Sequence, residues 1–140
     1  MARNRTRLGR GQIRSFEIQV EFLRGLILRD PGYVEALAEL AELELQLGRV
    51  EEALRLDQRL RELQPTDPEV RYNLACSLCL NRHFEQAAAE LSHALELGFK
   101  DVQSVQSDPD LADLRAHPAF RPIGARLRRL KASQGSADGC

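Results

Sequence analysis

Two cysteines one helical turn apart, Cys76 and Cys79, have the spacing of a possible chemical site. A Cys-x-x-Cys pair can act as a redox dithiol or supply half of a zinc site, and both roles depend on thiolates. The pair falls in the middle of a predicted helix, away from the N-terminal dipole that would favour a thiolate, and no second ligand pair completes a zinc site. We therefore expect packing residues, with no metal and no cofactor. A regulatory thiol pair is the alternative.

Sequence motifs of catalysis are absent. The chain contains no Gly-x-Ser-x-Gly, no phosphate-binding loop and no His-Glu-x-x-His. Its three histidines stand apart, since His83 falls at a predicted turn, His93 within a helix and His117 before a proline. We expect a protein that is not an enzyme.

Charge is segregated along the chain although the net charge is only -1. Residues 1–14 carry five arginines and no acid, residues 115–131 carry six basic residues, and residues 15–114 carry nine basic against twenty acidic residues. Such asymmetry can indicate an acidic partner, a nucleic acid, or attraction between the ends and the middle. No aromatic cluster accompanies the arginines, so binding of nucleic acid or an anionic surface by the basic termini is the second interpretation.

The elements that must position these residues follow an internal repeat. Residues 34–67 align with residues 68–101, and eight positions are identical. A period of about 34 residues is typical of stacked helical hairpins, because one hairpin cannot bury its own apolar face. The identical pairs are Glu35/Glu69, Leu40/Leu74, Ala41/Ala75, Glu51/Glu85, Ala53/Ala87, Glu62/Glu96, Leu63/Leu97 and Asp67/Asp101.

Apolar residues recur with the period of a helix, and no stretch alternates as a strand would. Asp67-Pro68-Glu69 and Asp108-Pro109-Asp110 each combine an N-cap, a first-turn proline and an acid. Gly48-Arg49 and Asn81-Arg82-His83 separate apolar stripes and predict tight turns. We predict helices near 15–29, 33–47, 50–63, 68–81 and 84–97, and shorter ones near 101–107, 109–115 and 117–130.

The repeated positions resemble the tetratricopeptide repeat family. The family signature consists of leucine with a small residue, a turn glycine, an aromatic, an alanine and a closing proline. The first unit matches it at Leu40-Ala41, Gly48, Ala53 and Pro65, and the second at Tyr72-Asn73-Leu74-Ala75, Phe84 and Ala87. Departures are Arg71 for an early bulky residue, Arg82 for the turn glycine and Gly98-Phe99 for the proline. Residues 98–120 are similar to the segment that closes bacterial arrays of this family.

The resemblance implies an all-α fold, a right-handed superhelical stack of antiparallel helical hairpins with C-terminal capping helices. We expect a basic flexible arm at 1–14, one domain at 15–130 and a disordered tail at 131–140. Within the domain, residues 15–33 form a degenerate half repeat, 34–67 and 68–101 two repeats, and 102–130 the cap. The residues expected to cover the last hairpin are Leu111, Leu114, Phe120, Ile123 and Leu127.

In this family the first helices of successive units line a concave groove. The matching residues are Glu35, Ala38, Glu42, Leu45, Gln46, Glu69, Tyr72, Cys76, Cys79 and Leu80. They would form an apolar surface with an acidic rim, suited to a protein or peptide with apolar anchors and Lys or Arg. The alternative is that Tyr72 and its neighbours pack against an adjacent element of the same chain. Glu42, Ala38, Tyr72 and Cys76 stand where some members bind a C-terminal carboxylate through Lys, Asn or Arg, so that activity is not expected.

The sequence thus predicts a non-catalytic protein-binding module, an adaptor or a subunit of a complex. An odd number of cysteines without a secretory signal favours a reducing compartment, and we expect the cytoplasm; an organelle-targeting role for the arginine-rich residues 1–14 is the alternative. No apolar run is long enough to predict a membrane span. The partner and the oligomeric state are not encoded in any motif that we can identify.

Overall fold

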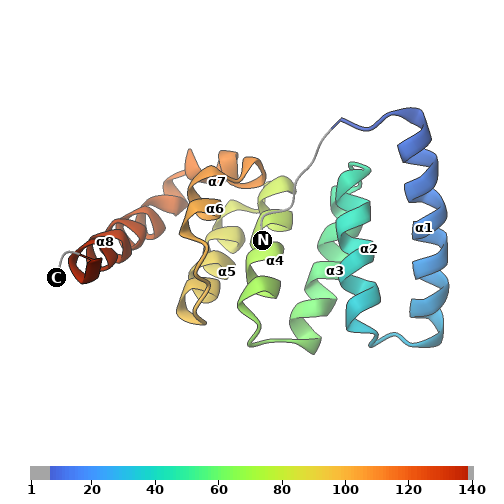
Figure 1. The fold of residues 1–140 in the computed structure, drawn as a ribbon, viewed down its shortest axis with the longest axis horizontal. Coiled ribbons are helices and arrows are strands. Elements are labelled where there is room, and N and C mark those ends of the chain that lie inside the picture. The colour runs from blue at the N-terminus through green and yellow to red at the C-terminus, as the bar shows by residue number, and fades with distance from the viewer. Residues whose placement is uncertain (1–6, 139–140) are drawn as a thin grey trace.

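Two helical hairpins form the centre of the molecule. The computed structural model describes residues 7–138, and their regular secondary structure is entirely helical (Figure 1). Helices α2 (Val34–Gln46) and α3 (Val50–Leu63) form the first hairpin, and α4 (Pro68–Leu80) and α5 (Phe84–Glu96) form the second. Helix α3 packs on α4, and α1 (Arg10–Arg29) packs beside α2. The predicted all-α array of hairpins is confirmed.

Four alanines allow the helices within each hairpin to approach closely. Ala41 and Ala53 in the first hairpin, and Ala75 and Ala87 in the second, have no exposed surface. A larger side chain at any of these positions would force the paired helices apart, because helix axes that meet through alanine lie closer than those that meet through leucine. The internal sequence repeat thus corresponds to a repeat of hairpin geometry.

Short helices close the second hairpin. These are α6 (Val102–Ser107), the 3-10 helix η1 (Pro109–Leu111), α7 (Ala112–Arg115), the 3-10 helix η2 (Pro118–Phe120) and α8 (Arg121–Asp138), which extends away from the array (Figure 1). The predicted covering residues lie in the same apolar core as α4 and α5. Leu111, Leu114, Ile123 and Leu127 are buried, and Phe120 is half-buried against that core. The predicted capping helices are confirmed.

Local chemistry sets the helix ends. The Asp67 carboxylate accepts hydrogen bonds from the backbone N–H groups of Glu69 and Val70, and Asp108 accepts one from the N–H of Asp110. The hairpin turns use a left-handed residue, with φ of 79° at Gly48 and 65° at Arg82. An arginine therefore occupies the backbone conformation that the first unit gives to glycine.

The unusual Arg71 is explained by its tertiary partners. Its Nη1 atom lies 2.9 Å from Glu90 Oε2 on α5, and its Nε–H donates to the Pro65 carbonyl over 3.0 Å. Arg61 on α3 donates to the other oxygen of Glu90 over 2.6 Å. One buried carboxylate thus links α3, α4 and α5 through Arg61 and Arg71, and Arg71 stands where the family signature has a bulky side chain.

The predicted limits of the terminal segments need correction. Helix α1 begins at Arg10 rather than near residue 15, and the amide side chain of Gln12 accepts from the N–H of Gly9 over 3.0 Å at this start. Helix α8 continues to Asp138, although we predicted a disordered tail from residue 131. No proline interrupts residues 123–138, so only Gly124 and Gly135 disfavour continuation strongly. Residues 1–6 and 139–140 lie outside the described residues.

Candidate functional site

The predicted groove residues of the first unit are divided between surface and interior. Glu35, Ala38 and Glu42 are exposed on α2, and Gln46 is half-buried. Leu45, the apolar anchor predicted for this unit, is 1% exposed and belongs to the interior. The accessible part of this surface is therefore acidic and has little apolar area for a ligand.

In the second unit the predicted groove is covered by the chain itself. Glu69 is exposed and Leu80 half-buried, but Tyr72, Cys76 and Cys79 are buried. The Tyr72 ring stacks on Phe99 with 4.3 Å between ring centroids. Its hydroxyl donates to Asp108 Oδ2 over 2.7 Å. The expectation that these three side chains line an open surface is therefore corrected, because the cap occupies the space beside α4, as the alternative interpretation held.

Burial also determines the chemistry of the tyrosine and the cysteines. It raises the pKa of the Tyr72 hydroxyl and that of the Cys79 thiol, because a charged form would lose its hydration. Neither Cys76 nor Cys79 forms a disulfide, and Cys76 Sγ lies 3.8 Å from Asp108 Oδ2. A raised pKa disfavours the reactive thiolate, which supports a packing role. Among residues 7–138, no group of three or more His, Cys, Asp or Glu side chains could hold a metal ion.

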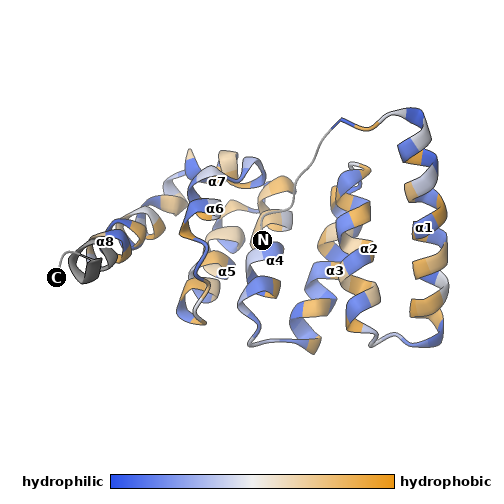
Figure 2. Ribbon diagram, in the orientation of Figure 1, coloured by the Kyte–Doolittle hydropathy of each residue, from blue (hydrophilic) through white to orange (hydrophobic). Residues whose placement is uncertain are grey.

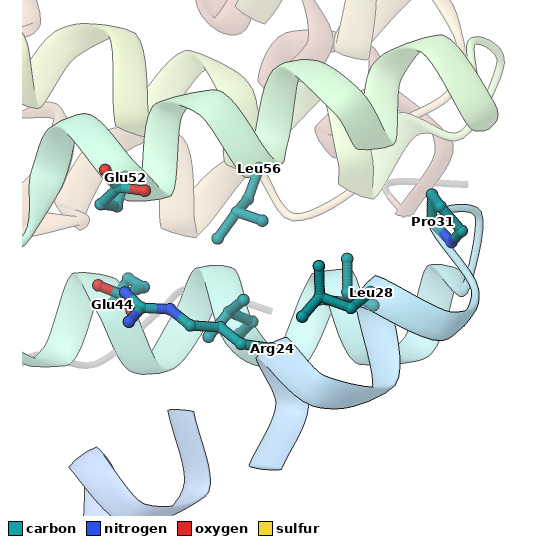
Figure 3. Close-up of a pocket in the computed structure, with 8 residues that line it drawn as sticks. Arg24, Leu28, Pro31, Glu44, Glu52 and Leu56 are labelled. Carbon is teal, nitrogen blue, oxygen red and sulfur yellow. Dashed lines mark hydrogen bonds and ion pairs between the residues drawn. The ribbon is translucent and has the colours of Figure 1, made fainter. Parts of the chain in front are cut away.

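An apolar cleft lies between α1 and α3 with α2 as its floor; we call it the α1–α3 cleft. Its volume is about 530 Å³. Figure 3 shows Leu28 of α1 and Leu56 of α3 beside this space, with Pro31 at one end. Leu28 is 85% exposed, the largest exposure among the large apolar side chains described. The lining residues are Arg24, Ile27, Leu28, Pro31, Leu40, Glu44, Glu52 and Leu56.

The charged groups at this cleft are largely paired. Glu44 is 1% exposed, and Arg24 Nη2 donates to its Oε1 atom over 3.1 Å (Figure 3). The guanidinium of Arg49 lies 3.5 Å from the other oxygen of Glu44. Glu52, which is more exposed, pairs with Arg55 along α3. The cleft thus offers an apolar wall with one accessible carboxylate at its edge.

Sequence reasoning missed this cleft because it treated α1 only as part of a degenerate unit. Ile18, Phe22 and Leu28 are exposed, while Val20 and Leu23 face the core with α2. Apolar residues are accordingly found on more than one side of α1 (Figure 2). A helix that packs against one neighbour needs only one apolar face. The wider apolar surface of α1 is the sequence signal that could have indicated the cleft.

A second cleft, here called the α7–α8 cleft, lies where the cap meets α8. Its volume is about 460 Å³, and it is lined by basic side chains and one aromatic ring. Arg121, Gly124 and Arg128 share one face of α8, since they are spaced three and four residues apart. Arg115 and His117 contribute from the preceding segment. This cleft gathers part of the basic C-terminal cluster seen in the sequence.

Comparison with known proteins agrees with the geometry. Residues 20–72, from within α1 to the first turns of α4, match the family model of the tetratricopeptide repeat. This part of the chain resembles the tetratricopeptide repeat. Repeats of this family generally mediate protein–protein interaction and are generally non-catalytic.

A curated relative is a chloroplastic protein of Arabidopsis thaliana. It is 33% identical over 79 residues, which cover 54% of this chain and 24% of the relative. The chain thus spans about a quarter of the length of that protein. Within residues 7–138, no helix has both the length and the apolar character needed to cross a bilayer.

Proposed function

We propose that the chain is a non-catalytic protein-interaction module, an adaptor or a subunit, that binds an apolar segment of another protein in the α1–α3 cleft. The observation that carries this proposal is an open apolar cleft beside the highly exposed Leu28. Monomeric proteins rarely leave a contiguous apolar area uncovered unless it binds something. The buried anchors of the predicted groove cannot serve a ligand in the same way.

The charges around the cleft favour a partner with a basic residue beside its apolar anchor. Glu44 is already compensated by Arg24 and Arg49, so it stabilises the floor of the cleft. Glu52 is half-exposed and can receive a Lys or Arg from a ligand. The accessible groove positions Glu35 and Glu42 are acidic and favour the same class of partner.

A substitution at the cleft tests this proposal. Immobilised wild-type chain and a Leu28→Glu variant are compared for the proteins that they retain from an extract of the source cell, quantified by mass spectrometry. Burial of a leucine side chain in an interface contributes about 1.5–3 kcal/mol, so specific partners should fall by about tenfold or more. An Ile18→Glu variant is the matched control, because Ile18 is exposed on α1 but does not line the cleft.

The paired variants give a clear outcome. Proteins lost with Leu28→Glu and retained with Ile18→Glu would support the cleft as the binding site. Equal retention by wild type and Leu28→Glu, or equal loss with both variants, would contradict it. A cytoplasmic location remains a prediction that rests on the odd number of cysteines.

A further inference from the structure

The α7–α8 cleft has a rigid basic wall. Arg115 Nη1 donates to the carbonyl oxygens of Val105, over 3.2 Å, and Asp108, over 2.8 Å. These two hydrogen bonds fix the position of the guanidinium. They do not neutralise its positive charge, because a carbonyl group carries no net charge. His117 is held as well, because its Nδ1 atom accepts from the N–H of Ala119 over 3.1 Å.

Two further arginines, Arg121 and Arg128, line the cleft. Among the side chains that the structure describes, no carboxylate lies within ion-pair distance of Arg121 or Arg128. By contrast, Arg126 on the same helix lies 4.0 Å from Glu96. Glu85, which is largely exposed, lies 3.9 Å from His117 Nε2. The cleft therefore holds positive charge at Arg121 and Arg128 that no described carboxylate pairs with.

Gly124 keeps the space between these arginines open. A methyl group added at Gly124 would lie 3.7 Å from Arg128 Nη1 and 3.6 Å from Phe120 Cε1. The guanidinium of Arg128 and the ring of Phe120 thus flank the same short stretch of bare helix backbone. Alanine would fit with ordinary contacts, whereas a long side chain would occupy the cleft.

The geometry points to the α7–α8 cleft as a binding site for the carboxylates of an acidic segment in a partner protein, distinct from the α1–α3 cleft. Guanidinium groups bind carboxylates through two parallel hydrogen bonds, and Phe120 and Pro118 offer apolar contact beside them. A protein ligand fits better than a nucleic acid, because nucleic-acid binding uses phosphate contacts spread along an extended track or several stacked bases. This inference goes beyond the proposed function and does not depend on it.

The probe is a short fluorescein-labelled peptide in which pairs of glutamates alternate with leucine, measured by fluorescence anisotropy at about 0.15 M ionic strength. We expect saturable binding, weakened at least about tenfold by Arg121→Ala/Arg128→Ala. Both side chains are exposed, so the variant should keep its fold. Arg129→Ala/Lys131→Ala is the matched control, because it removes the same charge from α8 outside the cleft and should change binding by less than about threefold.

Steric and chemical controls complete the test. Gly124→Gln should abolish binding, and Gly124→Ala should leave it within about threefold of wild type. The same peptide with glutamine in place of glutamate should not bind. Equal weakening by the two double variants, equal binding of the glutamine peptide, or no binding at about millimolar protein would overturn the inference. Tighter binding of a single-stranded oligonucleotide of equal charge would also overturn it, in favour of nucleic acid.

Discussion

The hydrogen bond between Tyr72 and Asp108 should be a principal link between the second hairpin and its cap. Replacing Tyr72 by Phe removes only the hydroxyl, so the ring can keep its stacking on Phe99. Asp108 is 2% exposed, and its Oδ2 atom then retains only the Cys76 thiol at 3.8 Å as a weak donor. The carboxylate would therefore lose its strongest side-chain partner without gaining water.

The magnitude follows from the charge and the burial. Hydrogen bonds to charged groups contribute about 1.5–3 kcal/mol, and a buried acceptor left without its donor carries the full cost of desolvation. We expect Tyr72→Phe to lower the free energy of unfolding by about 2 kcal/mol. Tyr33→Phe is the matched control, since Tyr33 is 40% exposed and should cost less than about 0.5 kcal/mol.

Urea unfolding followed by far-ultraviolet circular dichroism measures both variants. The midpoint should fall for Tyr72→Phe while the slope of free energy against urea stays constant, because the surface exposed on unfolding is unchanged. A loss below about 0.5 kcal/mol, or a loss equal to that of Tyr33→Phe, would refute the assignment of this hydrogen bond as a link that stabilises the cap.

Two further predictions concern the turns and the thiols. Gly48→Ala should lower stability by about 1 kcal/mol, because φ at Gly48 is 79°. Gly25→Ala inside α1 should instead raise stability by about 0.5–1 kcal/mol, because glycine disfavours a helix interior. Calorimetric melting measures both variants, and shifts of the melting temperature in the same direction would contradict the conformational explanation. In a Cys140→Ser variant at mildly alkaline pH, Cys76 and Cys79 should react with a thiol reagent only after denaturation, because burial raises the pKa of the Cys79 thiol and keeps it protonated. Rapid labelling of the native protein would contradict their packing role.

Helices and caps were predictable because their signals are local. Asp67 and Asp108 accept from the backbone of the following turn, as their position before a proline predicted. The internal repeat placed Gly48 and Arg82 at equivalent turns, and both have positive φ. Sequence could not reveal the reason for Arg71, because its partner Glu90 lies on the next helix and belongs to no motif.

The candidate site was less predictable because a helix face does not state which neighbour will cover it. Tyr72 occupies a position that lines the groove in the family, yet Phe99 and Asp108 bury it here. The segment that follows the second hairpin is a cap, and its closeness to α4 depends on tertiary packing. Conversely, Leu28 is exposed because no described residue covers that side of α1. A local sequence pattern does not encode whether such a neighbour exists.

The two clefts differ in the force that would hold a ligand, and this difference separates their functions experimentally. The α1–α3 cleft is apolar, and its buried carboxylate Glu44 is compensated, so binding there should depend weakly on ionic strength. The α7–α8 cleft offers the exposed charges of Arg121 and Arg128, whose attraction to a carboxylate is screened beyond about 8 Å at physiological salt. A partner that engages both would lose affinity with salt mainly through its acidic segment, and less through any basic residue that pairs with Glu52. The net charge of -1 averages over surfaces of different chemistry, and we propose that a chain of this size joins an apolar segment of one protein to an acidic segment of the same protein or of another.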